Sequence, residues 1–277
     1  MKTVANQRRS WMVLILSGLC LLASPVFADD DERRRGGREA SQCKHLPNHH
    51  ALRTALQDAV AEETSGYDFH MWATIIDRDG IVCAVAFSGA DRHSQLLGAR
   101  VISAQKANAA NSFSTDLFAV STANSYTLTQ PGGWGYGLLQ GNPVDTDVIY
   151  KGPARRFGKR NDPMTGRRVG GGIFFGGGLA LYDGGKMVGA LGAGGDTPCA
   201  DHMIAWRVRH ALSLDEFNPL VAFFPTSGDP DRPDNIVYDV VPNPNGGAGF
   251  SPSGVGHTDC LGGFNQGDET ALPKVRY

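Results

Sequence analysis

Long hydrophobic runs are almost absent from this chain of 277 residues. The exception, residues 11–22, follows a basic start and is too short to span a bilayer comfortably. It is followed by Val26-Phe27-Ala28, the small-x-small pattern that signal peptidase accepts. We therefore expect residues 1–28 to be a cleaved signal peptide, which leaves a periplasmic or secreted chain without a membrane anchor.

An excess of positive charge is also missing. The sequence has 26 basic and 28 acidic residues. The first 28 residues hold three of the basic ones and no acidic one, so the mature chain carries 23 against 28, a net charge of −5. This balance argues against binding to nucleic acid or to an anionic membrane surface. Residues 29–45 form a charged leader, in which a short arginine run stands among acidic residues.

The common catalytic motifs are missing as well. There is no HExxH, GxSxG, GxxxxGK[ST] or complete GxGxxG. The glycine clusters at residues 170–172, 176–178 and 194–195 lack the Lys-Ser/Thr pair of a phosphate-binding loop. We expect them to serve turns and close backbone packing. The residues alone therefore do not indicate an enzyme.

CxxC and CxxCH motifs do not occur, which argues against a zinc ribbon, a thioredoxin-type site and covalent c-type haem. Four cysteines remain after cleavage, an even number that favours disulfides in an exported chain. Three complete pairings are possible for Cys43, Cys83, Cys199 and Cys260. We prefer Cys43 with Cys260, which would join the two ends of the mature chain.

Apolar periodicity predicts an alternation of helices and hairpins. The expected elements are a helix around residues 52–60, a hairpin over 72–87, a helix over 96–113, a hairpin over 173–191 and a helix over 198–212. Each hairpin contains an Asp-Gly turn, and the last helix begins with Thr197 as its cap and Pro198 at its first position. Helices segregated against an antiparallel sheet make an α+β sandwich.

The elements divide the mature chain into two parts. Residues 46–214 form one domain with an insertion at 140–169, which holds the basic residues Arg155, Arg156, Lys159, Arg160, Arg167 and Arg168. The simpler interpretation is that the insertion is a solvated loop. The alternative is that its basic side chains attract the carboxylates of a ligand or an acidic partner protein. Residues 215–277 are rich in Pro and Gly, so we expect an irregular wrap over the domain with one short strand at 236–241.

Three segments resemble the GlcG/HbpS family of haem-binding proteins. "TIIDRDGIV" is similar to that family's hairpin, "ISAQKANAANSF" to its Lys-Ala helix, and residues 169–201 to its glycine-rich hairpin with a following acidic residue. The order and rough spacing of the three agree. Asn108 and Ala109 depart from the helix motif, where relatives carry an aromatic residue and Thr.

The resemblance implies a profilin-like fold, homo-oligomers and non-covalent binding of haem. It extends to the haem-binding domain attached to PduO-type cobalamin adenosyltransferases. Our first hypothesis is an exported small-molecule binding protein, with haem as its cofactor, for uptake, buffering or sensing. A haem-degrading or other enzyme that uses the same pocket is the second hypothesis. A non-catalytic oligomeric partner protein is the third.

The matched motifs place candidate ligand-binding residues at Lys106, Asp201 and four glycines, namely Gly171, Gly172, Gly194 and Gly195. Free amides after Gly194 and Gly195, at a helix start, would suit an anion such as a haem propionate; a simple capped helix is the alternative. Lys106 is either an electrostatic contact to a carboxylate ligand or part of a structural salt bridge.

Three histidines are candidate iron ligands: His202, His50 and His93. His202 follows the family's acidic position, although such a residue is more often exposed or hydrogen-bonded. His49 lies on the apolar stripe of the first helix and is expected to pack. His257 belongs to the C-terminal wrap and would reach a pocket only if that segment folds over it.

Overall fold

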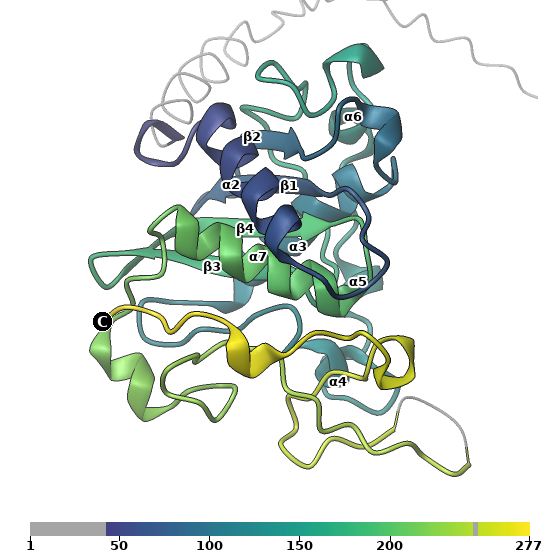
Figure 1. The fold of residues 1–277 in the computed structure, drawn as a ribbon, viewed down its shortest axis with the longest axis vertical. Coiled ribbons are helices and arrows are strands. Elements are labelled where there is room, and N and C mark those ends of the chain that lie inside the picture. The colour runs from purple at the N-terminus through teal and green to yellow at the C-terminus, as the bar shows by residue number, and fades with distance from the viewer. Residues whose placement is uncertain (1–42, 246–248) are drawn as a thin grey trace, which may run out of the picture.

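The computed structural model describes residues 43–245 and 249–277 (Figure 1). The expected signal peptide and most of the charged leader lie outside the described residues. Within the described ranges, no helix is both long and apolar enough to cross a membrane.

Four antiparallel strands form one sheet in the order β2-β1-β4-β3. Their bounds are β1 (Trp72–Asp77), β2 (Val82–Phe87), β3 (Gly178–Asp183) and β4 (Lys186–Gly194). Both hairpins are confirmed, and β1 pairs with β4 to join them. The second hairpin begins at Gly178, later than residue 173, where the sequence placed it.

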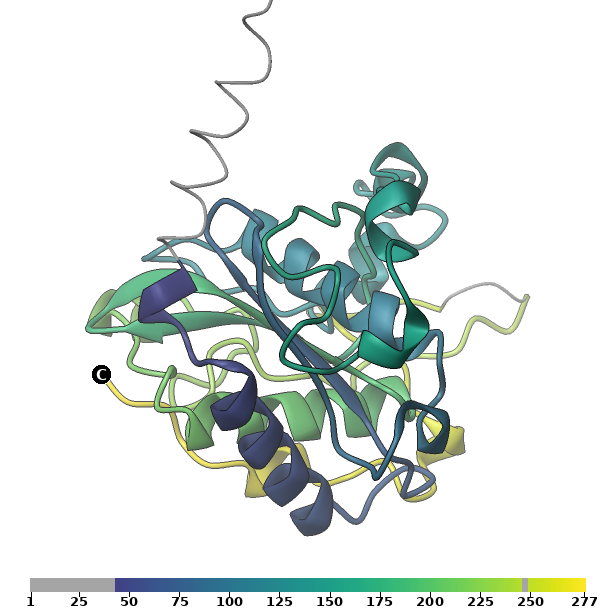
Figure 2. The same ribbon diagram turned by 90° about the horizontal axis from the view of Figure 1, so that it is seen from above.

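Helices cover both faces of the sheet (Figure 2). The long ones are α2 (His49–Glu62) and α7 (Pro198–Ala211) on one face and α3 (Ala99–Phe113) on the other. Three single-turn helices lie between α3 and β3, namely α4 (Tyr126–Thr129), α5 (Leu138–Gly141) and α6 (Thr146–Ile149). Short 3₁₀ turns occupy Cys43–His45, Arg92–Ser94, Ala154–Arg156, Pro219–Phe223, Leu261–Gly263 and Glu269–Ala271. The predicted α+β sandwich is confirmed.

Small residues let α3 lie unusually close to the sheet. A Cβ added at Gly192 of β4 would come within 1.9 Å of the Ser103 carbonyl oxygen. Alanines 104, 107 and 110 present the short side chains that this approach requires. Thr74 and Ser103, whose Oγ atoms are 2.8 Å apart, satisfy each other within the contact. The glycine and alanine content of these motifs is thus explained by packing.

The arginine-rich insertion is anchored to α3 by a buried ion pair. Arg100 donates through Nε to Asp162 at 2.9 Å and through Nη1 to the Ile149 carbonyl at 2.8 Å. Its guanidinium lies 3.8 Å from the centre of the Phe157 ring. Apolar residues of the insertion join the core on this face, while its six basic side chains named above are exposed.

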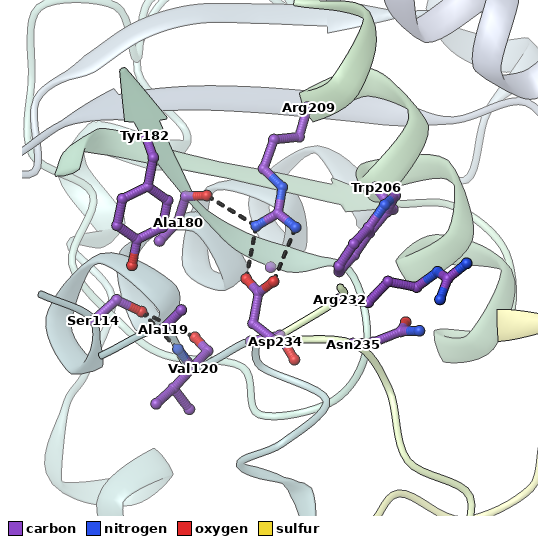
Figure 3. A network of polar contacts seen from close by, with 12 residues as sticks. Ser114, Ala119, Val120, Ala180, Tyr182, Trp206, Arg209, Arg232, Asp234 and Asn235 are labelled. Carbon is purple, nitrogen blue, oxygen red and sulfur yellow. Dashed lines mark hydrogen bonds and ion pairs between the residues drawn. The ribbon is translucent and has the colours of Figure 1, made fainter. Parts of the chain in front are cut away.

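The described residues after α7, 212–245 and 249–277, are mostly irregular backbone beside α7 and the β3 edge (Figures 1 and 2). Asp234 of this segment accepts two hydrogen bonds from Arg209 of α7, at 2.7 and 2.9 Å (Figure 3). The strand predicted at 236–241 is wrong: only an isolated bridge forms there, from Val241 to Phe250. The Ile236 amide, which a strand ladder would use, instead donates to the His202 ring at 3.1 Å.

The described part of the chain contains two disulfides, and the preferred pairing of Cys43 with Cys260 is wrong. Cys43 pairs with Cys83, and Cys199 pairs with Cys260, with Cα atoms 5.2 and 6.0 Å apart. The reason is the packing of α2, whose start places Cys43 beside β2, while the C-terminal segment returns to the start of α7. Each closed loop stabilises the fold by roughly 4 kcal/mol on the chain-entropy estimate.

Replacing Asp234 with Ala tests the anchor of the C-terminal segment. The change leaves Arg209, which is 0% exposed, buried without its counter-charge, and we expect a loss of about 3–5 kcal/mol in the free energy of unfolding. Urea unfolding under non-reducing conditions measures it. The matched control is Asp231→Ala, because Asp231 and its partner Lys274 are 47% and 65% exposed. That control is expected to cost at most about 1 kcal/mol. Equal losses in the two variants would contradict the assignment.

Candidate functional site

The two charged residues of the family motifs meet in one buried pair. Lys106 Nζ of α3 lies 2.5 Å from Asp201 Oδ2 of α7, and the side chains are 0% and 3% exposed. Burial raises the pKa of Asp201 to about 6, and the same loss of solvent lowers the pKa of Lys106. Lys106 therefore has a partner within the chain, which corresponds to the structural alternative for this residue.

The pair connects α3 with α7 beside Gly176 and Gly177, the two residues that precede the edge strand β3. A Cβ added at Gly177 would come 2.9 Å from Lys106 Nζ and 3.0 Å from Asp201 Cβ. The same atom at Gly176 would lie 2.1 Å from the Pro198 carbonyl oxygen. These glycines leave space for the ion pair and for the start of α7, as expected of a packing role.

The amides at the start of α7 are not free. The Asp196 amide donates to Asp201 Oδ1 at 2.9 Å, and the Thr197 amide donates to Asp196 Oδ1 at 2.6 Å. The Cys199 amide donates to Cys260 Sγ at 3.1 Å, and the Ala200 amide donates to Thr197 Oγ1 at 3.2 Å. Asp196 also accepts from the amides of Tyr67 and Phe69. Carboxylates of the chain itself already occupy the positive end of this helix. These hydrogen bonds correspond to the capped-helix alternative for this segment.

Gly171 and Gly172 belong to a different part of the molecule. The Gly171 carbonyl accepts from the side-chain amides of Asn108 and Asn142, at 2.6 and 3.0 Å. Asn108, a departure from the family motif, thus fastens α3 to the glycine-rich segment. A Cβ at Gly172 would approach the Phe174 ring at 3.0 Å.

The three candidate histidines do not come together. His50 and His93 are exposed, the first in α2 and the second near Asp91. His202 is 0% exposed, and its Nε2 lies 3.1 Å from the Ile236 amide and 3.3 Å from Asn235 Oδ1. Burial, with the nearby Arg209 charge, lowers the pKa of His202 to about 3. His49, expected to pack, places its Nε2 2.9 Å from the Gly158 carbonyl oxygen.

A groove opens beside the start of α7, and we call it the α7 groove. Its main cavity has a volume of about 510 Å³ and is lined by Tyr67, Phe69, Leu96, Tyr126, Phe175, Asp196, Thr197, Pro198, His257, Thr258, Asp259, Cys260 and Leu261. A second cavity of about 430 Å³ shares four of these residues, namely Leu96, Phe175, Asp196 and Pro198. Gly195 and Asp201 border this second cavity, so two of the predicted ligand-binding positions reach the groove.

His257 is the histidine that borders the groove. Its Nδ1 donates to the Thr258 carbonyl at 2.7 Å, and its Nε2 accepts a long hydrogen bond of 3.3 Å from the Gly176 amide. Because Nδ1 donates and Nε2 accepts, the His257 ring is neutral, with its proton on Nδ1 and its lone pair on Nε2. Burial lowers the pKa of His257 to about 4. The condition placed on this residue, that the C-terminal segment fold over a pocket, is met.

The aromatic wall of the groove was missed from the sequence. Tyr67 and Phe69 stack at 5.4 Å, yet they remain 57% and 43% exposed. Tyr126 lies 4.6 Å from the His257 ring. Tyr67 and Phe69 share one loop, whereas Tyr126 begins α4, so the three residues share no periodicity. The available signal was two aromatic residues in a loop, where burial does not require them.

Replacing His202 with Gln tests its burial in a neutral form. The pKa of His202 is depressed from 6.5 to about 3 in the folded state, so its contribution to stability is full above pH 6.5 and is lost as the pH falls. The loss from this group between pH 6.5 and pH 5 is about 2 kcal/mol. The variant should lack that part of the pH dependence of its unfolding free energy. Parallel curves for the variant and the wild type over this range would contradict the prediction.

Comparisons with known proteins identify the family of this chain. The solved structure of a PduOC–haem complex matches at 20% identity over 58% of this chain and 89% of that chain, with a TM-score of 0.40. The Klebsiella pneumoniae protein ORFY, described by the family model DUF336, matches at 20% identity over 60% of this chain and 90% of that chain, also with a TM-score of 0.40. No curated protein matches the chain. The family model described as haem degrading protein HbpS-like matches residues 48–209, and the chain therefore belongs to the HbpS-like family.

Proposed function

We propose that this chain binds haem non-covalently in the α7 groove, for uptake, buffering or sensing. The observation that carries the proposal is His257, a neutral histidine on the wall of the main cavity, whose Nε2 accepts only one long hydrogen bond, of 3.3 Å, from the Gly176 amide. Membership of the HbpS-like family supports the haem-related part of the proposal.

The groove suits a flat, largely apolar ligand. Its main cavity of about 510 Å³ falls within the usual range for small-molecule and cofactor sites. Tyr67, Phe69 and Phe175 supply ring surfaces on one cavity, and the neighbouring cavity of about 430 Å³ extends the space beyond Phe175. A planar macrocycle would therefore find aromatic faces for stacking and room along its length.

The donor set also suits iron. Haem iron is commonly held by the imidazole of a histidine, in its neutral form. The bond from His257 Nδ1 to the Thr258 carbonyl orients the ring in the way that backbone carbonyls orient metal-ligating histidines. His202, by contrast, has its Nε2 turned to the C-terminal segment and does not line the main cavity.

The charges around the groove predict the orientation of the ligand. The charged residues that line the main cavity are Asp196 and Asp259, and none of the lining residues is a cation. Asp196 is held in place by backbone amides of the loop that carries Tyr67 and Phe69. The propionates are therefore expected to point out of the groove toward solvent, with the apolar edge inside.

A haemin titration of the purified chain tests the proposal. We expect a saturable, shifted Soret band at about one haem per chain, because a single histidine borders the groove. His257→Ala should move the band and weaken binding about tenfold or more, whereas the matched control His93→Ala, on an exposed turn, should leave both unchanged.

A titration identical to free haemin, or an unchanged band in His257→Ala, would contradict the proposal. The same sample answers the enzymatic alternative raised by the family's description as haem degrading. If the Soret band persists when a reductant is added in air, the chain binds haem without degrading it. If the band decays catalytically, the chain degrades haem.

Export is the second part of the proposal. Two disulfides in the described part of the chain fit an oxidising compartment, and the leader at residues 1–28 has the signal-peptide pattern. N-terminal sequencing of protein recovered outside the cytoplasm should begin at Asp29. A chain that retains residues 1–28, or that stays in the cytoplasm, would overturn this part.

A further inference from the structure

We propose that reduction of the Cys199–Cys260 disulfide turns one wall of the α7 groove into a site for a thiophilic divalent cation such as Zn²⁺, held by Cys199, His257 and Cys260. This proposal does not depend on haem binding. It stands on three donor atoms brought together by segments that are far apart in the sequence.

The donors are already within reach of one ion. One ligand atom from each of Cys199, His257 and Cys260 lies within 4.8 Å of the others, and all three residues are buried. Ligands around tetrahedral zinc, with bonds of about 2.0–2.3 Å, lie roughly 3.3–3.8 Å apart. The change from a disulfide to a metal site therefore needs side-chain rotation more than backbone movement.

The surroundings of the two sulfurs favour thiolates after reduction. Cys199 is the second residue of α7, so its sulfur lies at the positive end of the helix, an end that it shares with the carboxylates of Asp196 and Asp201. Its own amide points at Cys260 Sγ, at 3.1 Å. The Cys199 amide can therefore donate to the Cys260 thiolate once the disulfide is reduced.

The reaction can be written with its electrons and protons. A dithiol reductant gives up two electrons and two protons and becomes a disulfide, while the Cys199–Cys260 bond breaks to two thiols. Binding of Zn²⁺ to the two sulfurs and to neutral His257 then releases two protons. Cys260 is 7% exposed and borders the main cavity, so the attack has a path through the groove.

Three protein ligands leave a fourth position open. His257 and Cys260 both line the main cavity, which places that position on the groove side. Water or a donor atom of a ligand in the groove would complete the tetrahedron. The C-terminal segment, fixed by a covalent bond when oxidised, would be fixed by the metal when reduced.

Zinc titration of the reduced chain, without haem, tests the proposal. A second group of donors, Cys43, Asp77 and Cys83, has similar spacing, so the titration uses the Cys43→Ser/Cys83→Ser background. In that background we expect one Zn²⁺ per reduced chain and none per oxidised chain, measured by calorimetry, and Co²⁺ in place of Zn²⁺ should show thiolate charge-transfer absorption.

Two further variants separate the site from adventitious binding. In the same background, Cys260→Ser and His257→Ala should each weaken zinc binding at least tenfold, while His93→Ala should not change it. Circular dichroism checks that each variant is folded, and His257→Ala keeps all the sulfurs should Cys260→Ser fail to fold. Absence of zinc binding in the reduced background, or equal affinity in folded His257→Ala, would overturn the proposal.

Discussion

A buried pair of charges, Arg209 of α7 and Asp234 of the C-terminal segment, holds together the parts from which the α7 groove is built (Figure 3). Both side chains are 0% exposed, so each ion has lost its water and depends on the other. The two-point geometry, a further bond from Arg209 to the Ala180 carbonyl, and the Trp206 ring 4.3 Å from the guanidinium offset that cost. This ion pair determines which residues of the C-terminal segment lie beside α7.

The groove follows from this attachment. Once Asp234 is fixed, Asn235 and Ile236 contact His202 of α7, and the His257 amide donates to the Val237 carbonyl. The Cys199–Cys260 bond then closes the segment against the first turn of the helix. The sandwich itself supplies the opposite wall through Phe175 and the loop carrying Tyr67. The family core and the C-terminal segment thus each provide half of the proposed site, and neither half has the histidine and the aromatic wall together.

Local chemistry made the core of the fold predictable. Thr197 and Pro198 defined the start of the last helix, and the Asp-Gly turns defined both hairpins, because caps and turns depend on neighbours in the sequence. The glycine clusters predicted close backbone packing, and the contact of α3 with Gly192 of the sheet is an example of it. The resemblance to the HbpS-like family then placed these elements in one architecture.

The remainder depends on contacts between distant segments, which no local pattern specifies. The disulfide partners, the bond between Arg209 and Asp234, and the location of His257 all follow from the path of an irregular segment. His202 looked like the better ligand because it stands beside the motif aspartate, yet helix geometry turns it into the core. Lys106 and Asp201 were recognised as important, but their chemistry is satisfied by each other.

The most direct measurement is a crystal structure of the chain loaded with haemin, with the iron located by its anomalous scattering. The proposal predicts a single iron peak within bonding distance of His257 Nε2, between the rings that line the α7 groove. An iron peak elsewhere, for example beside the exposed Tyr150 in the smaller cavity under the insertion, would contradict the central claim.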